Sequence, residues 1–202
     1  IFAKVPSAIG VAAANRNGVG MSGFSSRGDQ SDITTWPDVS APGVDIWSAA
    51  ARSTMIGGGT GVGDFGTGDL DYYYLSISGT SMATPHVAGL VALMFQAAPS
   101  LRMSNVDEDL SEEGDPNLYD PTGIAPPATA ARPIHEAELI LKLTADRIII
   151  GENIATSVNS TGVNGRTLDY TQGYGMVNAE KAVAVALALQ QLRDTDDDGI
   201  ID

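Results

Sequence analysis

One serine and its neighbours are the part of this chain best suited to chemistry. Ser81 follows a strand-like apolar run at residues 72–77 and two small residues, Ser78 and Gly79. Apolar residues then recur with helical spacing at Val87, Leu90, Val91, Met94 and Phe95. This pattern predicts that Ser81 lies where a strand passes into a helix. Amide groups in the first turn of a helix lack partners and carry partial positive charge, so they favour an oxyanion beside the serine hydroxyl.

Pro85 and the small polar residues fit this helix start. Proline is tolerated in the first turn of a helix, where its missing N–H costs no hydrogen bond, and we place Pro85 there. A simpler interpretation is that Thr80 and Ser81 only cap a buried helix. The length of the surrounding pattern argues against this simpler interpretation.

Residues 79–89 read Gly-Thr-Ser-Met-Ala-Thr-Pro-His-Val-Ala-Gly. This string resembles the serine motif of the subtilisin-like serine proteases, the subtilases or peptidase family S8. Four other segments resemble the same family: a strand after the substrate pocket, a Phe-Ser-Ser loop, an Ala-Pro-Gly turn, and the turn that opens the last helix of the domain. They are residues 5–13, 24–28, 39–44 and 173–179.

The resemblance implies an α/β fold with three layers, α/β/α, and a mostly parallel sheet. It implies that residues 1–193 are the C-terminal half of such a catalytic domain, taken from a secreted serine endopeptidase that hydrolyses proteins or peptides through an acyl-enzyme on Ser81. In this family the triad Asp and His and the oxyanion-hole Asn precede the serine. We therefore expect these residues to lie in a missing N-terminal half of the same domain, and we expect the chain alone to be inactive.

Neither histidine of this chain suits the role of the general base. His86 follows Ser81 by five residues on the expected helix, which places it about 140° around the helix axis. We interpret it as a packed residue of the motif. His135 comes after the serine in the sequence, whereas the triad histidine of the family comes before it. Asn15 and Asn17 lie in an expected turn and match no catalytic position.

Three other interpretations stay open. A sedolisin-type protease also has Ser-Gly-Thr-Ser but pairs the serine with carboxylates. An α/β-hydrolase would use Asp120 and His135, although Ala83 stands where its Gly-x-Ser-x-Gly motif needs glycine. A pseudoprotease would keep the fold as a calcium-dependent binding module. The Asp, His and Asn motifs upstream of the chain would distinguish these possibilities.

Several elements are expected to position or surround the serine. Insertions that form surface loops are expected near residues 53–71, which are rich in glycine, and 104–133. Pro133 should open a helix over residues 134–145. Asn178 should cap the last helix, with an apolar face made of Val183, Ala186, Leu187 and Leu192. Three successive tyrosines are candidates for lining a substrate groove, although aromatic residues in strands more often pack: Tyr72, Tyr73 and Tyr74.

The last nine residues, 194–202, predict a calcium loop or an acidic linker. Carboxylates stand at positions 1, 3, 5 and 9 of an EF-hand-type pattern, glycine stands at position 6, and a backbone carbonyl would come from position 7. The corresponding ligands are Asp194, Asp196, Asp198, Asp202 and the Ile200 carbonyl. The segment resembles thrombospondin type 3 or dockerin repeats, so calcium would be a structural cofactor.

Composition limits the partners of the chain. The formal net charge is −14, which would repel nucleic acid phosphates. No apolar run approaches the length of about 20 residues that a membrane span needs. There is no cysteine, so disulfides and thiolate metal sites are excluded. An acidic protein in a salty or calcium-bearing medium fits secretion, and both ends read as if cut from a longer protein.

Overall fold

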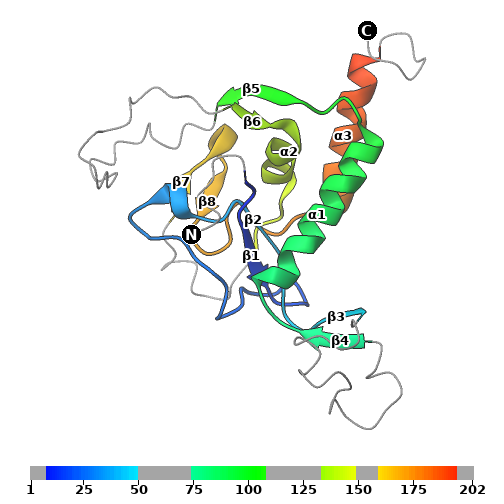
Figure 1. The fold of residues 1–202 in the computed structure, drawn as a ribbon. Helices are drawn as coiled ribbons and strands as arrows, with labels where there is room; N and C mark the ends of the chain where they lie inside the picture. Colours follow the sequence, from blue (N-terminus) through cyan, green and yellow to red (C-terminus); the bar gives the residue numbers. More distant parts are fainter. Residues whose placement is uncertain (1–7, 50–73, 108–132, 149–158, 195–202) are drawn as a thin grey trace.

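The computed structural model describes residues 8–49, 74–107, 133–148 and 159–194 (Figure 1). Its helices are α1 (Thr80–Ala97), α2 (Glu136–Thr144) and α3 (Ala179–Arg193). The strands are β1 (Val11–Ala14), β2 (Val39–Pro42), β3 (Ile46–Ala49), β4 (Tyr74–Ile77), β5 (Met103–Asp107), β6 (Pro133–His135), β7 (Asn159–Thr161) and β8 (Thr167–Asp169). The chain therefore mixes helices and strands, as expected for an α/β fold.

The centre of the molecule is the parallel pair β1–β2. Val11 lies opposite Val39, and Ala14 lies opposite Pro42. Residue Met176 extends the pair through a parallel bridge to Ser40. The alanines of β1 are fully buried beneath α1, whose inward face consists of Ala83, Val87, Leu90 and Met94. Small side chains on the strands thus let the helix lie close to the sheet.

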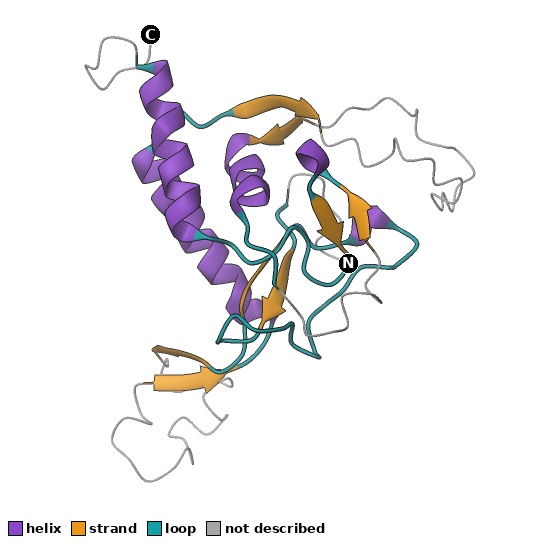
Figure 2. Cartoon of the chain, turned by 180° about the vertical axis from the view of Figure 1, so that it is seen from behind, coloured by secondary structure: helices purple, strands orange, loops and turns teal. Residues whose placement is uncertain are grey.

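The other described strand pairs are antiparallel and lie around this centre. They are β3–β4, β5–β6 and β7–β8. Seen from behind in Figure 2, α1 and α3 run side by side along one flank of the molecule, with β3–β4 at one end and β5–β6 at the other. The β3–β4 hairpin therefore projects from the end of the molecule at which α1 begins.

Helix α2 begins later than the sequence predicted. Pro133 lies in β6 rather than at the first helical position, and the helix begins at Glu136. His135 is the N-cap, and its Nδ1 accepts a hydrogen bond of 3.1 Å from the N–H of Ala137. Met103 of β5 pairs with His135, so strand pairing holds residues 133–135 extended and the histidine side chain starts the helix. Both ends of the insertion predicted at residues 104–133 therefore belong to strands, β5 and β6.

The predicted N-cap of α3 is confirmed, and its predicted apolar face is confirmed only in part. The Asn178 side chain accepts a hydrogen bond of 2.9 Å from the N–H of Lys181. Ala186 is buried and Val183 is partly buried against the core, whereas Leu187 and Leu192 are 44% and 78% exposed. The helix is apolar around most of its circumference, so the sequence could not indicate which side faces α1.

Some sequence predictions fall outside the described residues. They concern the insertion near 53–71, residues 108–132 of the second insertion, Tyr72, Tyr73 and Asp120, and the tail beyond Asp194. In the described ranges, none of the helices combines the length and the apolar character that crossing a membrane requires.

Candidate active site

Ser81 is the second residue of α1, immediately after the β3–β4 hairpin. Strand β4 ends at Ile77, Ser78 and Gly79 turn the chain, and α1 begins at Thr80. The strand-to-helix junction predicted from the sequence is therefore present. The carbonyl of the N-cap residue Gly79 accepts hydrogen bonds from the N–H groups of Met82 and Ala83, at 3.0 and 3.3 Å.

The turn before Ser81 is fixed to the Ala-Pro-Gly segment at the end of β2. The N–H of Gly79 donates to the carbonyl of Gly43 at 2.7 Å, and the N–H of Asp45 donates to Ser78 Oγ at 2.9 Å. A Cβ on Gly43 would lie 2.8 Å from the Gly79 carbonyl oxygen and 2.7 Å from the Cβ of Ala13. Glycine is thus required at position 43 because two backbone segments approach closely there.

The Ser81 side chain is exposed, and among the described residues its hydroxyl has no hydrogen-bond partner. Its backbone N–H lies in the first helical turn, where an N–H group has no helical carbonyl four residues earlier to bond and the helix dipole is positive. The arrangement can present a hydroxyl to a substrate carbonyl and place an N–H donor beside it. Within the part of the chain that the structure describes, no side chain is hydrogen-bonded to the hydroxyl as an acceptor of its proton.

Pro85 is not in the first turn, contrary to the sequence prediction. Because α1 begins at Thr80, Pro85 is its sixth residue and lies inside the helix. A residue there would normally donate its N–H to the carbonyl four residues earlier, which is that of Ser81, and proline has no N–H to donate. The Thr84 hydroxyl donates to the Thr80 carbonyl at 2.9 Å, which adds a bond to this weakened turn.

The two histidines are both held away from the Ser81 hydroxyl. The Nδ1–H of His86 donates to the carbonyl of Met82 at 2.8 Å, and the side chain is exposed rather than packed, unlike the expectation. The ring of His135 lies 5.5 Å from that of Phe95. Phe95 follows Ser81 by 14 residues, a distance of about 21 Å along a helix. His135 is therefore not a base for Ser81 in this structure.

The structure tests the predicted calcium ligands only in part. Of the five, the structure describes only Asp194, which is the C-cap of α3 and donates its N–H to the carbonyl of Gln190 at 3.2 Å. Asp196, Asp198, Ile200 and Asp202 lie outside the described residues. No group of three or more His, Asp or Glu side chains within the described ranges is arranged to hold a metal ion.

Two features of the site were missed by the sequence analysis. The Phe-Ser-Ser loop supports the sheet, because buried Ser25 Oγ accepts a hydrogen bond of 2.8 Å from the N–H of Ala13 on β1. The side chain of Trp47, on β3, stands 61% exposed on the hairpin that leads to Ser81. Trp47 belongs to no motif and its position in the hairpin depends on the strand register, so only the structure indicates its place.

Comparison with known proteins places the chain in a family. The model of the subtilase family matches residues 2–175. Serine protease AprX of Bacillus subtilis is 37% identical over 102 residues, which are 48% of this chain and 22% of that protein. Minor extracellular protease Vpr of the same species is 41% identical over 86 residues, 41% of this chain and 9% of that protein. The chain thus spans less than a quarter of the length of these relatives.

The fold is similar to that of solved subtilisin-like structures. Fervidolysin from Fervidobacterium pennivorans, described as a keratinolytic enzyme related to subtilisin, superimposes with a TM-score of 0.50 at 25% sequence identity. The similarity covers 90% of this chain and 20% of that chain. The described elements therefore correspond to part of a larger fold.

Proposed function

This chain belongs to the subtilase family, and we propose that it supplies the nucleophile of a serine endopeptidase that hydrolyses peptide bonds. The observation that carries the proposal is the placement of Ser81. Its exposed side chain stands in the first turn of α1, on a turn that Gly43 and Ser78 fix to the rest of the fold. Serine hydroxyls in such positions are nucleophiles of acyl transfer when a base is present.

The proposed reaction has two steps. The Ser81 Oγ attacks the carbonyl carbon of the scissile peptide bond while a base takes its proton, and the N–H of Ser81 donates to the developing oxyanion. The C–N bond breaks as the base returns the proton to the amine, leaving an ester on Ser81. Water then attacks the ester carbonyl while the base takes its proton. The ester C–O bond breaks as the base returns the proton to Ser81 Oγ, and the carboxylic product leaves.

The base and the acid that orients it are proposed to come from polypeptide outside residues 1–202. No histidine precedes Ser81 in the sequence, His86 is bonded to its own helix, and His135 lies beside Phe95. We propose that the same missing polypeptide supplies an oxyanion-hole Asn and covers the outer face of α1. The 202-residue chain alone is then inactive.

Turnover by the complete protease tests the proposal. Ser81→Ala should remove essentially all hydrolysis of casein, because the acyl acceptor is lost. His135→Ala should leave most of it, and Thr84→Ala on the same helix is the control for changes to α1. Loss of activity in His135→Ala equal to that in Ser81→Ala would contradict the assignment. A complete protein without any Ser81-dependent turnover would instead be a pseudoprotease.

We also propose secretion and a structural calcium site in the tail. The net charge of −14 and the similarity to a minor extracellular protease support an extracellular location. Carboxylates at Asp194, Asp196, Asp198 and Asp202, with the Ile200 carbonyl, support calcium. Calorimetry should show affinity of about 1 mM or weaker for residues 1–202, a gain when the native continuation is restored, and loss of that gain in Asp198→Ala. An extended tail that binds no calcium would show that these residues are a linker.

A further inference from the structure

The β3–β4 hairpin exposes two large aromatic side chains on one of its faces. In this antiparallel pair Trp47 lies opposite Ser76, and Tyr74 lies opposite Ala49. Opposed residues share a face and successive residues alternate between faces, so these four residues lie on the same side of the hairpin. Trp47 is 61% exposed and Tyr74 is 51% exposed.

We call these four residues the aromatic face. Trp47 and Tyr74 are diagonal neighbours across the two strands, a separation of about 7–8 Å that large side chains can span. Ser76 and Ala49 fill the other two positions with small side chains. Aromatic residues in strands usually pack against a core, but these two keep more than half of their surface exposed. The result is an apolar surface bounded by small side chains.

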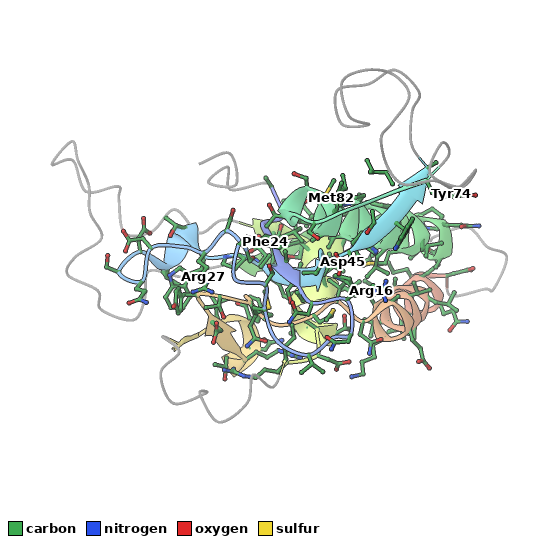
Figure 3. The ribbon with its side chains drawn as sticks, turned by 90° about the horizontal axis from the view of Figure 1, so that it is seen from below. Arg16, Phe24, Arg27, Asp45, Tyr74 and Met82 are labelled. Atoms are coloured by element: carbon green, nitrogen blue, oxygen red, sulfur yellow. The ribbon has the colours of Figure 1, made fainter. Side chains whose placement is uncertain are left out.

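The aromatic face is held in a fixed relation to Ser81. The inner ends of both strands are tied to the turn before the serine, through the bond from Asp45 N–H to Ser78 Oγ at 2.9 Å and that from Gly79 N–H to the Gly43 carbonyl at 2.7 Å. Figure 3 shows Asp45 at the inner end of the hairpin, and Tyr74 toward its outer end, away from Met82 of α1. A ligand on this face would therefore be positioned relative to the nucleophile.

The distance from the aromatic face to Ser81 suits an extended peptide. Ser76, the partner of Trp47, precedes Ser81 by five residues. Five residues of chain span at most about 18 Å, and an extended peptide advances about 3.3 Å per residue. A peptide whose scissile bond lies at Ser81 would reach Trp47 with a side chain no more than about five residues away from that bond.

We propose that the aromatic face is a substrate subsite, which binds one aromatic or large apolar side chain of an extended peptide up to about five residues from the cleaved bond. The proposal rests on the proposed function and adds the class of substrate side chain. Aromatic rings would pack edge-to-face or offset against Trp47 and Tyr74, and water would leave the apolar surfaces on both sides. The bonds of Asp45 to Ser78 and of Gly79 to Gly43 link the inner ends of β3 and β4 to the turn before Ser81.

The first experiment measures turnover by the complete protease. Fluorogenic peptides carry a single Phe in an alanine background, moved one position at a time through five residues on either side of the cleaved bond. One position should show kcat/KM about tenfold higher with Phe than with Ala, the size expected for burying one such side chain. Trp47→Ala and Tyr74→Ala should abolish this preference, and Trp47→Phe should retain it.

The matched control is Leu192→Ala, which removes another exposed apolar side chain, 78% exposed, at the end of α3. It should leave the Phe preference unchanged. The proposal is overturned if no position prefers Phe, or if the preference survives in both Trp47→Ala and Tyr74→Ala. The proposal is also overturned if Trp47→Ala and Tyr74→Ala lower kcat/KM equally for the Phe and Ala peptides. An equal loss is typical of a purely structural role.

A second experiment detects binding without catalysis. The chain has two tryptophans; Trp36 is 9% exposed and donates its Nε1–H to the Asp29 carbonyl, whereas Trp47 is exposed. In the complete Ser81→Ala protein, the preferred Phe peptide should shift the tryptophan emission to the blue in a saturable way. Trp47→Phe should remove the shift, and the all-alanine peptide should not produce it.

The two experiments separate failure of the subsite from failure of the proposed function. If no Ser81-dependent turnover occurs but the Phe peptide still shifts the emission of Trp47, the protease assignment fails and the binding face stands. If turnover occurs but the Phe peptide leaves the Trp47 emission unchanged, the subsite proposal fails and the protease assignment stands.

Discussion

At the scale of single residues, the position of Ser81 depends on a glycine that carries no reactive group. Gly43 accepts the hydrogen bond of Gly79 through its carbonyl, and the absence of a side chain lets it lie against both Gly79 and Ala13. The backbone of the nucleophile turn is therefore positioned by close packing of main-chain atoms. The position of Ser81 therefore depends on a contact of Gly43 that one added methyl group would disturb.

Gly43→Ala should accordingly destabilise the fold and impair the site. The new Cβ would lie 2.7 Å from that of Ala13 and 2.8 Å from the Gly79 oxygen, and relief of such contacts costs about 1–3 kcal/mol. Urea unfolding should show this loss of free energy. Gly23→Ala is the control, since its Cβ would meet nothing within 4 Å. Equal stabilities for the two variants would show that the turn adjusts easily.

At the scale of elements, α2 is fixed to the rest of the molecule by a buried ion cluster. Lys142 is fully buried, and its Nζ lies 2.9 Å from Asp38 Oδ1 and 2.7 Å from Glu138 Oε1. The same amine lies 5.7 Å from the centre of the buried ring of Tyr174. Asp38 immediately precedes β2, so the cluster joins α2 to the central strands.

Removing the cation of this cluster should be costly. Lys142→Ala leaves the buried carboxylate of Glu138 and the partly buried carboxylate of Asp38 without their compensating charge, and such losses cost about 3–5 kcal/mol. Lys181→Ala is the control, because the Lys181–Asp146 pair is about half exposed, at 56% and 53%, and exposed pairs contribute about 0–1 kcal/mol. The measurement is the free energy of unfolding in urea. Similar losses in the two variants would refute a special role for the buried cluster.

The N-terminal end of α2 should make stability depend on pH. Burial raises the pKa of Glu136, but hydrogen bonds from Arg193 and from the N–H of Arg102 outweigh burial and hold the pKa below its ordinary value of 4.5. A carboxyl with a lowered pKa stabilises the fold above its ordinary pKa, and this contribution is lost as the pH falls through the lowered value.

Unfolding curves between pH 7 and pH 3 test this effect. The wild-type chain should lose more stability than Glu136→Gln as the pH falls below 4.5, because the glutamine side chain does not titrate. Asp146→Asn is the comparison at an exposed carboxyl, whose pKa is lowered by Lys181 and Asn178. Parallel pH profiles for the wild type and Glu136→Gln would contradict the account.

At the scale of the whole molecule, the described residues leave open the face of α1 that carries Leu93. Leu93 is 52% exposed, whereas Phe95, 39% exposed, lies about 200° around the helix axis and contacts His135 on another face. A helix that is apolar around its circumference is usually buried on all sides. The proposed function accounts for this face, since the remaining part of the catalytic domain would cover it.

A charge on that face should therefore be tolerated in this chain and harmful in the complete protein. Leu93→Asp should change the stability of residues 1–202 by no more than about 0.5 kcal/mol. In the complete protein the same change would bury an unpaired charge and should cost about 3 kcal/mol or more. Leu192→Asp is the control and should be mild in both contexts. A mild effect of Leu93→Asp in the complete protein would show that α1 stays open.

The sequence predicted those parts of the fold that local rules determine. The strand before Ser81, the helix after it and the Asn178 cap follow from periodicity and capping, and all are present. The start of α2 was predicted wrongly because strand pairing of His135 with Met103 overrides the preference of Pro133. The aromatic face and the Lys142 cluster depend on contacts between residues distant in sequence, which no local pattern reveals.

The most direct test of the account is covalent labelling of Ser81 by a fluorophosphonate probe, read by mass spectrometry of the peptide that contains it. In the complete protein we expect the adduct on Ser81 and none in Ser81→Ala, because the base supplied from outside residues 1–202 activates the hydroxyl. In the 202-residue chain alone we expect no labelling above the Ser81→Ala background. Labelling of Ser81 in the isolated chain, or of another serine in the complete protein, would contradict the account.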